Sequence, residues 1–154
     1  MIPVIFVAPH LSENASRMVE AIGALPGVQL GVISMDRVDH AGDQTRGAIA
    51  QHWRVDDVLD AEQLRGAVQQ VAIRIGGVER LFGAYEQLQV PLAQVREELG
   101  IAGLPVQAAL NFRDKARMKD VLRAARLPCA RHMLVETYLD AIRFAERVGF
   151  PLVI

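Results

Sequence analysis

The stretch Ile2-Pro3-Val4-Ile5-Phe6-Val7-Ala8 is an unbroken apolar run that begins directly after the first residue. Runs of this kind are typical of strands that are buried on both faces of a parallel sheet. A second apolar run spans residues 28–33, and between the two lies a helical stripe that ends at Leu25-Pro26-Gly27. Two strands around one helix predict a right-handed βαβ unit, which is the simplest source of an open α/β sheet.

The alternation of strand and helix patterns continues to about residue 100. Residues 35–51 are polar and contain glycine, and we expect them to form a long, mobile connection. Short strands are expected at residues 52–55 and 78–85, on either side of a helix that Asp60 caps. A further helix carries Pro91 in its first turn. The resulting order of elements is that of a doubly wound α/β fold.

Composition excludes several classes of protein. The 154 residues are 51% hydrophobic and carry a net charge of -1, which excludes a disordered chain and argues against a dedicated nucleic-acid binder. The single cysteine, Cys129, excludes a disulfide framework. No apolar run is long enough to span a membrane, and Met1 is not followed by the basic start of a signal peptide. We therefore expect a cytoplasmic protein that binds neither nucleic acid nor membrane.

The carboxyl-terminal third differs in composition from the rest. Residues 101–105 have the composition of a linker, and residues 113–131 hold seven basic and two acidic residues, a net charge of +5. We expect a helix in this basic stretch, a strand at residues 130–135, a helix that begins with the capping pair Thr137 and Asp140, and a strand at 150–154. The final strand would have no partner in the sequence after it, which indicates a piece of a longer protein.

Four ordered segments resemble the entry into an ATP-grasp domain. They are Leu99-Gly100-Ile101-Ala102-Gly103-Leu104-Pro105, Arg113-Asp114-Lys115, Leu127-Pro128 and Val148-Gly149-Phe150-Pro151-Leu152-Val153-Ile154. The superfamily includes biotin carboxylase, D-alanine–D-alanine ligase and several purine-biosynthesis ligases. The first hundred residues resemble the preATP-grasp domain in topology and position. The resemblance implies an α/β fold: a Rossmann-like, open, mostly parallel sheet over residues 1–102, then a truncated α+β segment of the ATP-grasp domain over 103–154.

The resemblance also implies an activity for the parent enzyme. ATP-grasp ligases activate a small-molecule carboxylate as an acyl phosphate and join it to an amine or a similar nucleophile, using ATP and Mg²⁺. The lysine that corresponds to Lys115 contacts the nucleotide, usually its phosphates. The family's second lysine, its lid loop and its magnesium carboxylates would lie after Ile154. We therefore expect an amino-terminal fragment that is inactive alone, holds no catalytic or metal-ligating residue and binds no ATP or Mg²⁺ by itself; a homodimer is also expected from the family.

The first strand-to-helix turn, residues 8–14, contains no glycine. A dinucleotide site would need glycines there so that the backbone could approach the pyrophosphate, so NAD and FAD binding are disfavoured. His10 and Ser12 nevertheless follow the first strand, and Glu86 follows the fourth, at the edge where open α/β sheets bind ligands. The resemblance implies that this edge serves the non-nucleotide substrate. Helix capping by Ser12 and simple solvent exposure are the alternative explanations.

A second class of function remains open. The chain would then be a stand-alone α/β interaction or regulatory module without nucleotide chemistry, whose carboxyl-terminal helices pack on a partner. Lys115 would be an ordinary solvated lysine. The arginines of residues 113–131 could form a phosphate or RNA patch, but a solvated helix face is favoured because the stretch lacks interleaved aromatic residues for stacking on single-stranded bases, with only Phe112 near by. The histidines show no metal-ligand spacing. The sequence identifies neither the acid nor the acceptor of a ligation.

Overall fold

The computed structural model describes residues 1–153, and these form two compact units, Met1–Ala109 and Leu110–Ile154. The first unit is built on a parallel four-stranded sheet with the order β3-β2-β1-β4. Its strands are β1 (Ile2–Val7), β2 (Val28–Ser34), β3 (Gln51–Arg54) and β4 (Arg80–Phe82). The expected Rossmann-like, open α/β sheet is confirmed.

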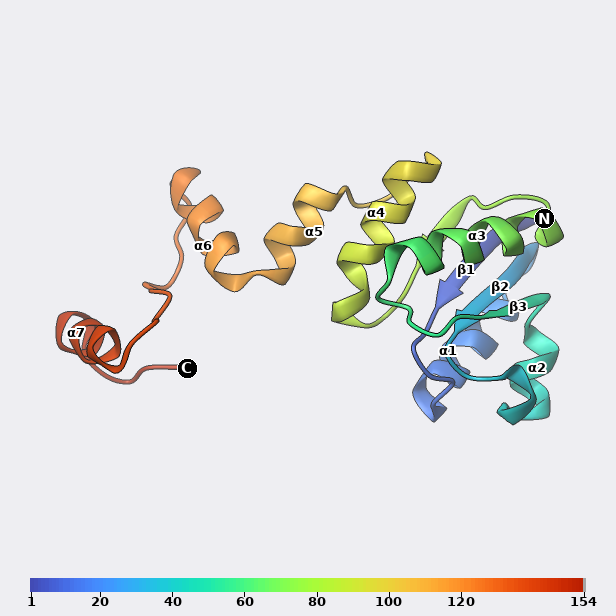
Figure 1. The fold of residues 1–154 in the computed structure, drawn as a ribbon, viewed down its shortest axis with the longest axis horizontal. Helices are drawn as coiled ribbons and strands as arrows, with labels where there is room; N and C mark the ends of the chain where they lie inside the picture. The colour runs from blue at the N-terminus through green and yellow to red at the C-terminus, as the bar shows by residue number, and fades with distance from the viewer. Residues whose placement is uncertain (154) are drawn as a thin grey trace. The chain divides into compact units, whose positions relative to one another are not determined.

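Helices cover both faces of this sheet (Figure 1). They are α1 (Glu13–Gly23), α2 (Asp43–Ala48), α3 (Ala61–Ile75) and α4 (Gln89–Leu99). Alternate residues of β1 point to opposite faces: Ile5 and Val7 pack in the core under α3 and α4, whereas Phe6 packs in the core under α1. The unbroken apolar run at the start of the sequence is therefore buried on both sides, as the fold requires.

Local signals place the helix ends of the first unit. The side chain of Ser12 caps α1, and that of Asp60 caps α3 by accepting from the backbone N–H groups of the first turn. Gly76 and Gly100 follow α3 and α4 in the left-handed region, with φ of 80° and 66°. These ends agree with the sequence expectation.

The connection over residues 35–51 differs from the mobile loop expected there. It holds a short 3-10 helix, η1 (Val38–His40), followed by α2. Thr45 of α2 is buried and donates a 2.6 Å hydrogen bond to Glu20 of α1. This contact with a distant helix gives the polar segment a structure that its hydropathy does not indicate.

The fourth strand is shorter than the expected span of residues 78–85. It ends at Phe82, because Gly83 turns the chain against the end of β1: a Cβ on Gly83 would stand 2.7 Å from the carbonyl oxygen of Val7. A second 3-10 helix, η2 (Glu86–Leu88), then leads into α4.

Arg96 of α4 holds the segment that follows this helix against β4. It is buried, and its guanidinium donates hydrogen bonds of 3.0 Å to the carbonyl oxygen of Leu81 in β4 and 3.2 Å to that of Leu104. Gly103 allows this approach, since a Cβ there would stand 2.6 Å from Cδ of Arg96. The expected linker is thus held against the first unit.

The described part of the second unit is helical. α5 (Val106–Arg113) spans the division between the units and had no counterpart in the expected elements; α6 (Lys115–Ala124) and α7 (Tyr138–Val148) follow. The capping box of Thr137 and Asp140 is present. Residues 130–135 and 150–153 are not strands, because no partner strand lies beside them among the residues described; Ile154 lies outside that part. The boundary expected at residue 102 remains a prediction.

Candidate functional site

His10 and Asp36 meet at the carboxyl edge of the sheet, after β1 and β2. Nδ1 of His10 lies 2.9 Å from one carboxylate oxygen of Asp36, and the other oxygen accepts a 2.7 Å hydrogen bond from the backbone N–H of Leu11. The backbone N–H of Met35 donates to the carbonyl oxygen of Pro9 at 3.0 Å, which extends the pairing of the two segments beyond the strands. Asp36 therefore bridges the first loop at two successive residues.

The buried hydroxyl of Ser34 supports the turn that carries Asp36. Ser34 is fully buried, and its hydroxyl donates a 3.1 Å hydrogen bond to the carbonyl oxygen of Asp36. Nε2 of His52, on β3, lies 2.8 Å from the same hydroxyl. Nε of Arg54 donates to the carbonyl oxygen of Met35 at 2.9 Å. The turn that carries Asp36 is thus held by both the buried serine and the third strand.

Ser12 and Glu86 occupy neighbouring loops of the same unit. The hydroxyl of Ser12 accepts the capping hydrogen bond from Ala15 at 3.4 Å and lies 3.3 Å from the hydroxyl of Tyr85. Glu86 is exposed and begins η2, directly after Tyr85. The structure therefore brings the loops that carry His10, Ser12 and Glu86 together at the sheet edge, while their roles toward a substrate remain predictions.

Sequence reasoning missed Asp36, Ser34, His52 and Tyr85. A usable signal existed for Asp36, because it follows the second strand just as His10 follows the first, and parallel strands end at one edge. No comparable signal existed for Ser34 and His52, which lie 18 residues apart and meet only through the pairing of β2 with β3.

The surroundings of the sheet edge favour an ionised carboxylate on Asp36 and a neutral imidazole on His52. The hydrogen bond from His10 is the main cause that lowers the pKa of Asp36 below its ordinary value; burial opposes it, and the N–H of Leu11 adds to it. Burial lowers the pKa of His52, against the opposing charges of Asp39 and Asp36. At neutral pH the edge therefore carries negative charge on Asp36.

Lys115 lies in the second unit, at the start of α6, where Asp114 caps the helix. It lines a pocket of about 380 Å³ together with Lys119, one turn further along the same helix. His132 lines the pocket as well; its Nδ1 is buried and has no hydrogen-bond partner among the described residues. The other walls are largely apolar, and they include Met133, Val135, Phe144 and Leu152. The two lysines are the only ones in the sequence.

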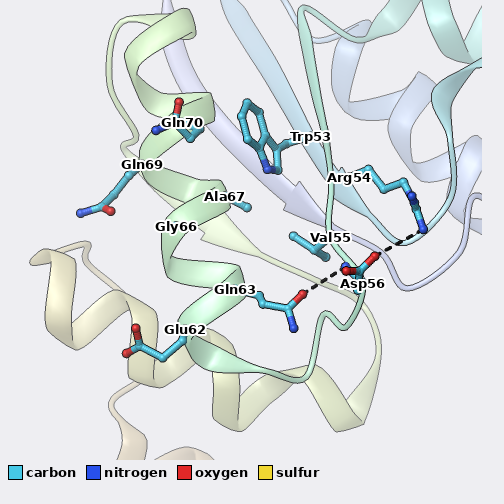
Figure 2. Close-up of a pocket in the computed structure, with 10 residues that line it drawn as sticks. All are labelled: Trp53, Arg54, Val55, Asp56, Glu62, Gln63, Gly66, Ala67, Gln69 and Gln70. Carbon is cyan, nitrogen blue, oxygen red and sulfur yellow. Dashed lines mark hydrogen bonds and ion pairs between the residues drawn. The ribbon is translucent and has the colours of Figure 1, made fainter.

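A pocket of about 450 Å³ lies on the flank of the first unit, between β3 and α3 (Figure 2). Trp53 stands on its wall and stacks on the guanidinium of Arg74, 4.9 Å from the ring centre. The side-chain oxygen of Gln63 accepts hydrogen bonds from the backbone N–H groups of Asp56 and Asp57. None of the residues expected from the sequence to bind a ligand lines this pocket, so its size alone does not make it the candidate site. Those residues are His10, Ser12, Glu86 and Lys115.

Two further findings concern metal ions and membranes. Within residues 1–153, no group of three or more histidine, cysteine or acidic side chains is arranged to hold a metal ion. In the same part of the chain, no helix is long and apolar enough to cross a membrane.

The chain is similar in sequence to amino acid ligases. It is 34% identical over 92 residues to an alanine–anticapsin ligase of Bacillus subtilis (strain 168), which covers 56% of this chain and 20% of that protein. It is 25% identical over 108 residues to an L-arginine-specific L-amino acid ligase of Bacillus subtilis, which covers 67% of this chain and 26% of that protein. The match thus spans about a fifth to a quarter of these relatives. No family model matches the chain.

Solved structures share the fold over almost the whole chain. Phosphoribosylglycinamide synthetase from Anaerococcus prevotii matches with a TM-score of 0.70 and 15% identity, covering 97% of this chain and 35% of that one. N5-carboxyaminoimidazole synthetase from Staphylococcus aureus, complexed with ADP, gives a TM-score of 0.69 at 14% identity, covering 97% and 36%. L-amino acid ligase from Bacillus licheniformis gives 0.57 at 14%, covering 96% and 42%.

Proposed function

This chain is related to the ATP-grasp ligases, and on that premise we propose that it forms the amino-terminal part of an ATP-dependent ligase that joins a small-molecule carboxylate to an amine. The two relatives compared above are ligases, and both are named for amino acid substrates. The chain matches only a minor part of each, so the complete reaction would need residues beyond those described.

Both lysines of the chain line one pocket, and this observation carries the proposal that the ligase binds ATP there. Ammonium groups of Lys115 and Lys119, one turn apart on α6, would offset the charge of phosphate oxygens as compact, multiple donors. The apolar walls of the pocket offer a surface on which the purine base can stack. ATP would supply the phosphoryl group that activates the carboxylate.

Magnesium, which the family implies, does not fit the residues described. Its usual ligands are one or two carboxylates plus substrate phosphates, and the pocket around Lys115 is lined by no acidic residue. We therefore assign no step of the reaction to a metal held by residues 1–153.

The non-nucleotide substrate is proposed to bind at the carboxyl edge of the sheet, near His10, Ser12 and Glu86. The hydrogen bonds that join the loops of His10 to Asp36 and of Ser12 to Tyr85 support this position, since they hold polar side chains together where open α/β sheets bind ligands.

Titration with ATP tests the proposal, using the full-length protein that contains this chain. We expect Lys115→Ala to weaken ATP binding about tenfold or more, which corresponds to about 1.4 kcal/mol, and Lys119→Ala to weaken it as well. Arg143→Ala is the matched control, because it removes an exposed cation of α7 that does not line the pocket. Unchanged affinity in Lys115→Ala would overturn the assignment, and no ATP binding at all would favour the interaction module.

A further inference from the structure

We propose that His10 and Asp36 form a proton-accepting pair that receives the ammonium group of the acceptor substrate at the carboxyl edge of the sheet. His10 would take the proton, and Asp36 would act as its positioning residue. The inference rests on the proposed function, because it names the substrate class for the edge where that proposal places the non-nucleotide substrate.

The contact between the two side chains fixes which nitrogen of His10 holds the proton. An ionised carboxylate can only accept hydrogen bonds, so Nδ1 of His10 donates to Asp36 across their 2.9 Å contact. In the neutral imidazole, Nε2 is then left without a proton and acts as an acceptor. The side chain of His10 is 64% exposed, so a ligand can reach this ring.

Asp36 is held firmly enough to orient the ring. Its second oxygen accepts the 2.7 Å hydrogen bond from Leu11, and its carbonyl oxygen accepts from the buried hydroxyl of Ser34. His52 contacts that hydroxyl from β3. Since these contacts come from the backbone and the sheet interior, the carboxylate is placed before any ligand arrives. Such support is what a positioned acid–base group requires.

The charges at the edge select an amine over a carboxylate. The ionised carboxylate of Asp36 places negative charge beside the ring of His10. Two arginines of the neighbouring segments have acidic partners: Arg37 pairs with Asp39, and Arg54, which bonds to the carbonyl oxygen of Met35, lies 3.4 Å from Asp56. The charge of His40 also acts on Asp36. The hydroxyls of Ser12 and Tyr85, 3.3 Å apart, can accept the remaining protons of an ammonium group.

The proposed step is a proton transfer that balances in charge. An N–H bond of the substrate ammonium breaks, its electron pair stays on nitrogen, and the proton binds Nε2 of His10. The resulting imidazolium is stabilised by the carboxylate of Asp36. The neutral amine can then form the C–N bond with the acyl phosphate, from which phosphate leaves with the electrons of the C–O bond, and the departing phosphate takes the second proton that the amide nitrogen must lose. The imidazolium returns its proton to water.

Nitrogen-15 NMR of the histidine rings tests the pair in the whole chain. We expect His10 to be protonated at Nδ1, and L-alaninamide, which has an amine and no carboxylate, to shift its Nε2 signal. N-acetyl-L-alaninamide, which lacks the ammonium group, is expected to leave that signal in place. Asp36→Asn should remove the Nδ1 preference and weaken alaninamide binding about tenfold or more, while Asp36→Glu should restore part of both. Asp39→Asn is the matched control, because Asp39 pairs with Arg37 instead.

Three results would overturn the inference: protonation of His10 at Nε2 in the wild type, an equal response to the acetylated probe, or a response to acetate instead of the amine. The amide spectrum of each variant shows whether it is folded, and Asp36→Glu keeps the test usable if Asp36→Asn is not. ATP binding at Lys115 is measured separately. If ATP binds and the His10 signal does not respond, only this inference fails; if His10 responds and ATP does not bind, the nucleotide proposal fails.

Discussion

Gly31 of β2 lies directly beneath Val71 of α3: a Cβ on Gly31 would stand 2.4 Å from Cγ1 of Val71. The same added atom would lie 3.3 Å from Ile75 and 3.4 Å from Ile5. The absence of a side chain at this one position lets α3 pack closely on the sheet.

Gly31→Ala is therefore expected to destabilise the first unit by about 1–3 kcal/mol, because the short, stiff side chain of Val71 cannot move away without shifting the helix. Gly66→Ala is the opposite case. Gly66 is in α3 with nothing within 4 Å of an added Cβ, so alanine should stabilise the helix by about 0.5–1 kcal/mol. Chemical denaturation measures both. Equal effects of the two substitutions would show that the close approach at Gly31 is not tight.

Thr137→Ala is expected to destabilise α7 by about 1 kcal/mol, because it removes the side chain that accepts from the backbone N–H of Asp140. The reciprocal bond from the backbone of Thr137 to Asp140 would remain. Amide hydrogen exchange in α7 measures the change. Glu146→Ala, at an exposed position of the same helix, should leave the exchange rates nearly unchanged.

Asp36→Asn is expected to alter the acid end of the stability profile. The pKa of Asp36 lies below its ordinary value of 3.8 in the folded protein, mainly because of the hydrogen bond from His10. The ionised carboxylate thus stabilises the fold at pH above 3.8, and this contribution is lost as the pH falls through the folded-state value. The difference in unfolding free energy between wild type and variant should shrink on acidification. A difference that stays constant with pH would contradict the contact.

His52→Gln is expected to change the profile near neutral pH. Burial lowers the pKa of His52 below 6.5 in the folded protein, so the unfolded chain takes up its proton first as the pH falls. The wild type should therefore lose stability relative to the variant as the pH falls through 6.5, until the folded-state imidazole also binds a proton. The other histidines are present in both proteins and cancel in the comparison. Parallel profiles would show that His52 is not held neutral by burial.

The sheet could be predicted from the sequence because its signals are local. The apolar run of β1 and the caps Ser12 and Asp60 each act within a few residues. α2 could not be predicted, since it is held by the contact of Thr45 with Glu20, 25 residues earlier. The strands expected at residues 130–135 and 150–154 show a complementary limit: an apolar run becomes a strand only beside another strand.

The position of the candidate site could be predicted from the sequence, but the contacts within it could not. Its edge follows from the parallel order of β1 and β4, which places His10, Ser12 and Glu86 after strand ends. The role of Asp36 was not predictable from the sequence, because it depends on contacts with His10 and Leu11, which lie 26 and 25 residues earlier in the chain.

The guanidinium of Arg96 keeps its charge throughout the physiological pH range, even though burial lowers its pKa. Its bonds to the carbonyl oxygens of Leu81 and Leu104 should therefore persist on acidification, whereas the surroundings of the half-buried His52 oppose its protonation. On mild acidification the protein would loosen first around His52 and the end of β2, while the contacts that hold the chain leaving α4 remain in place.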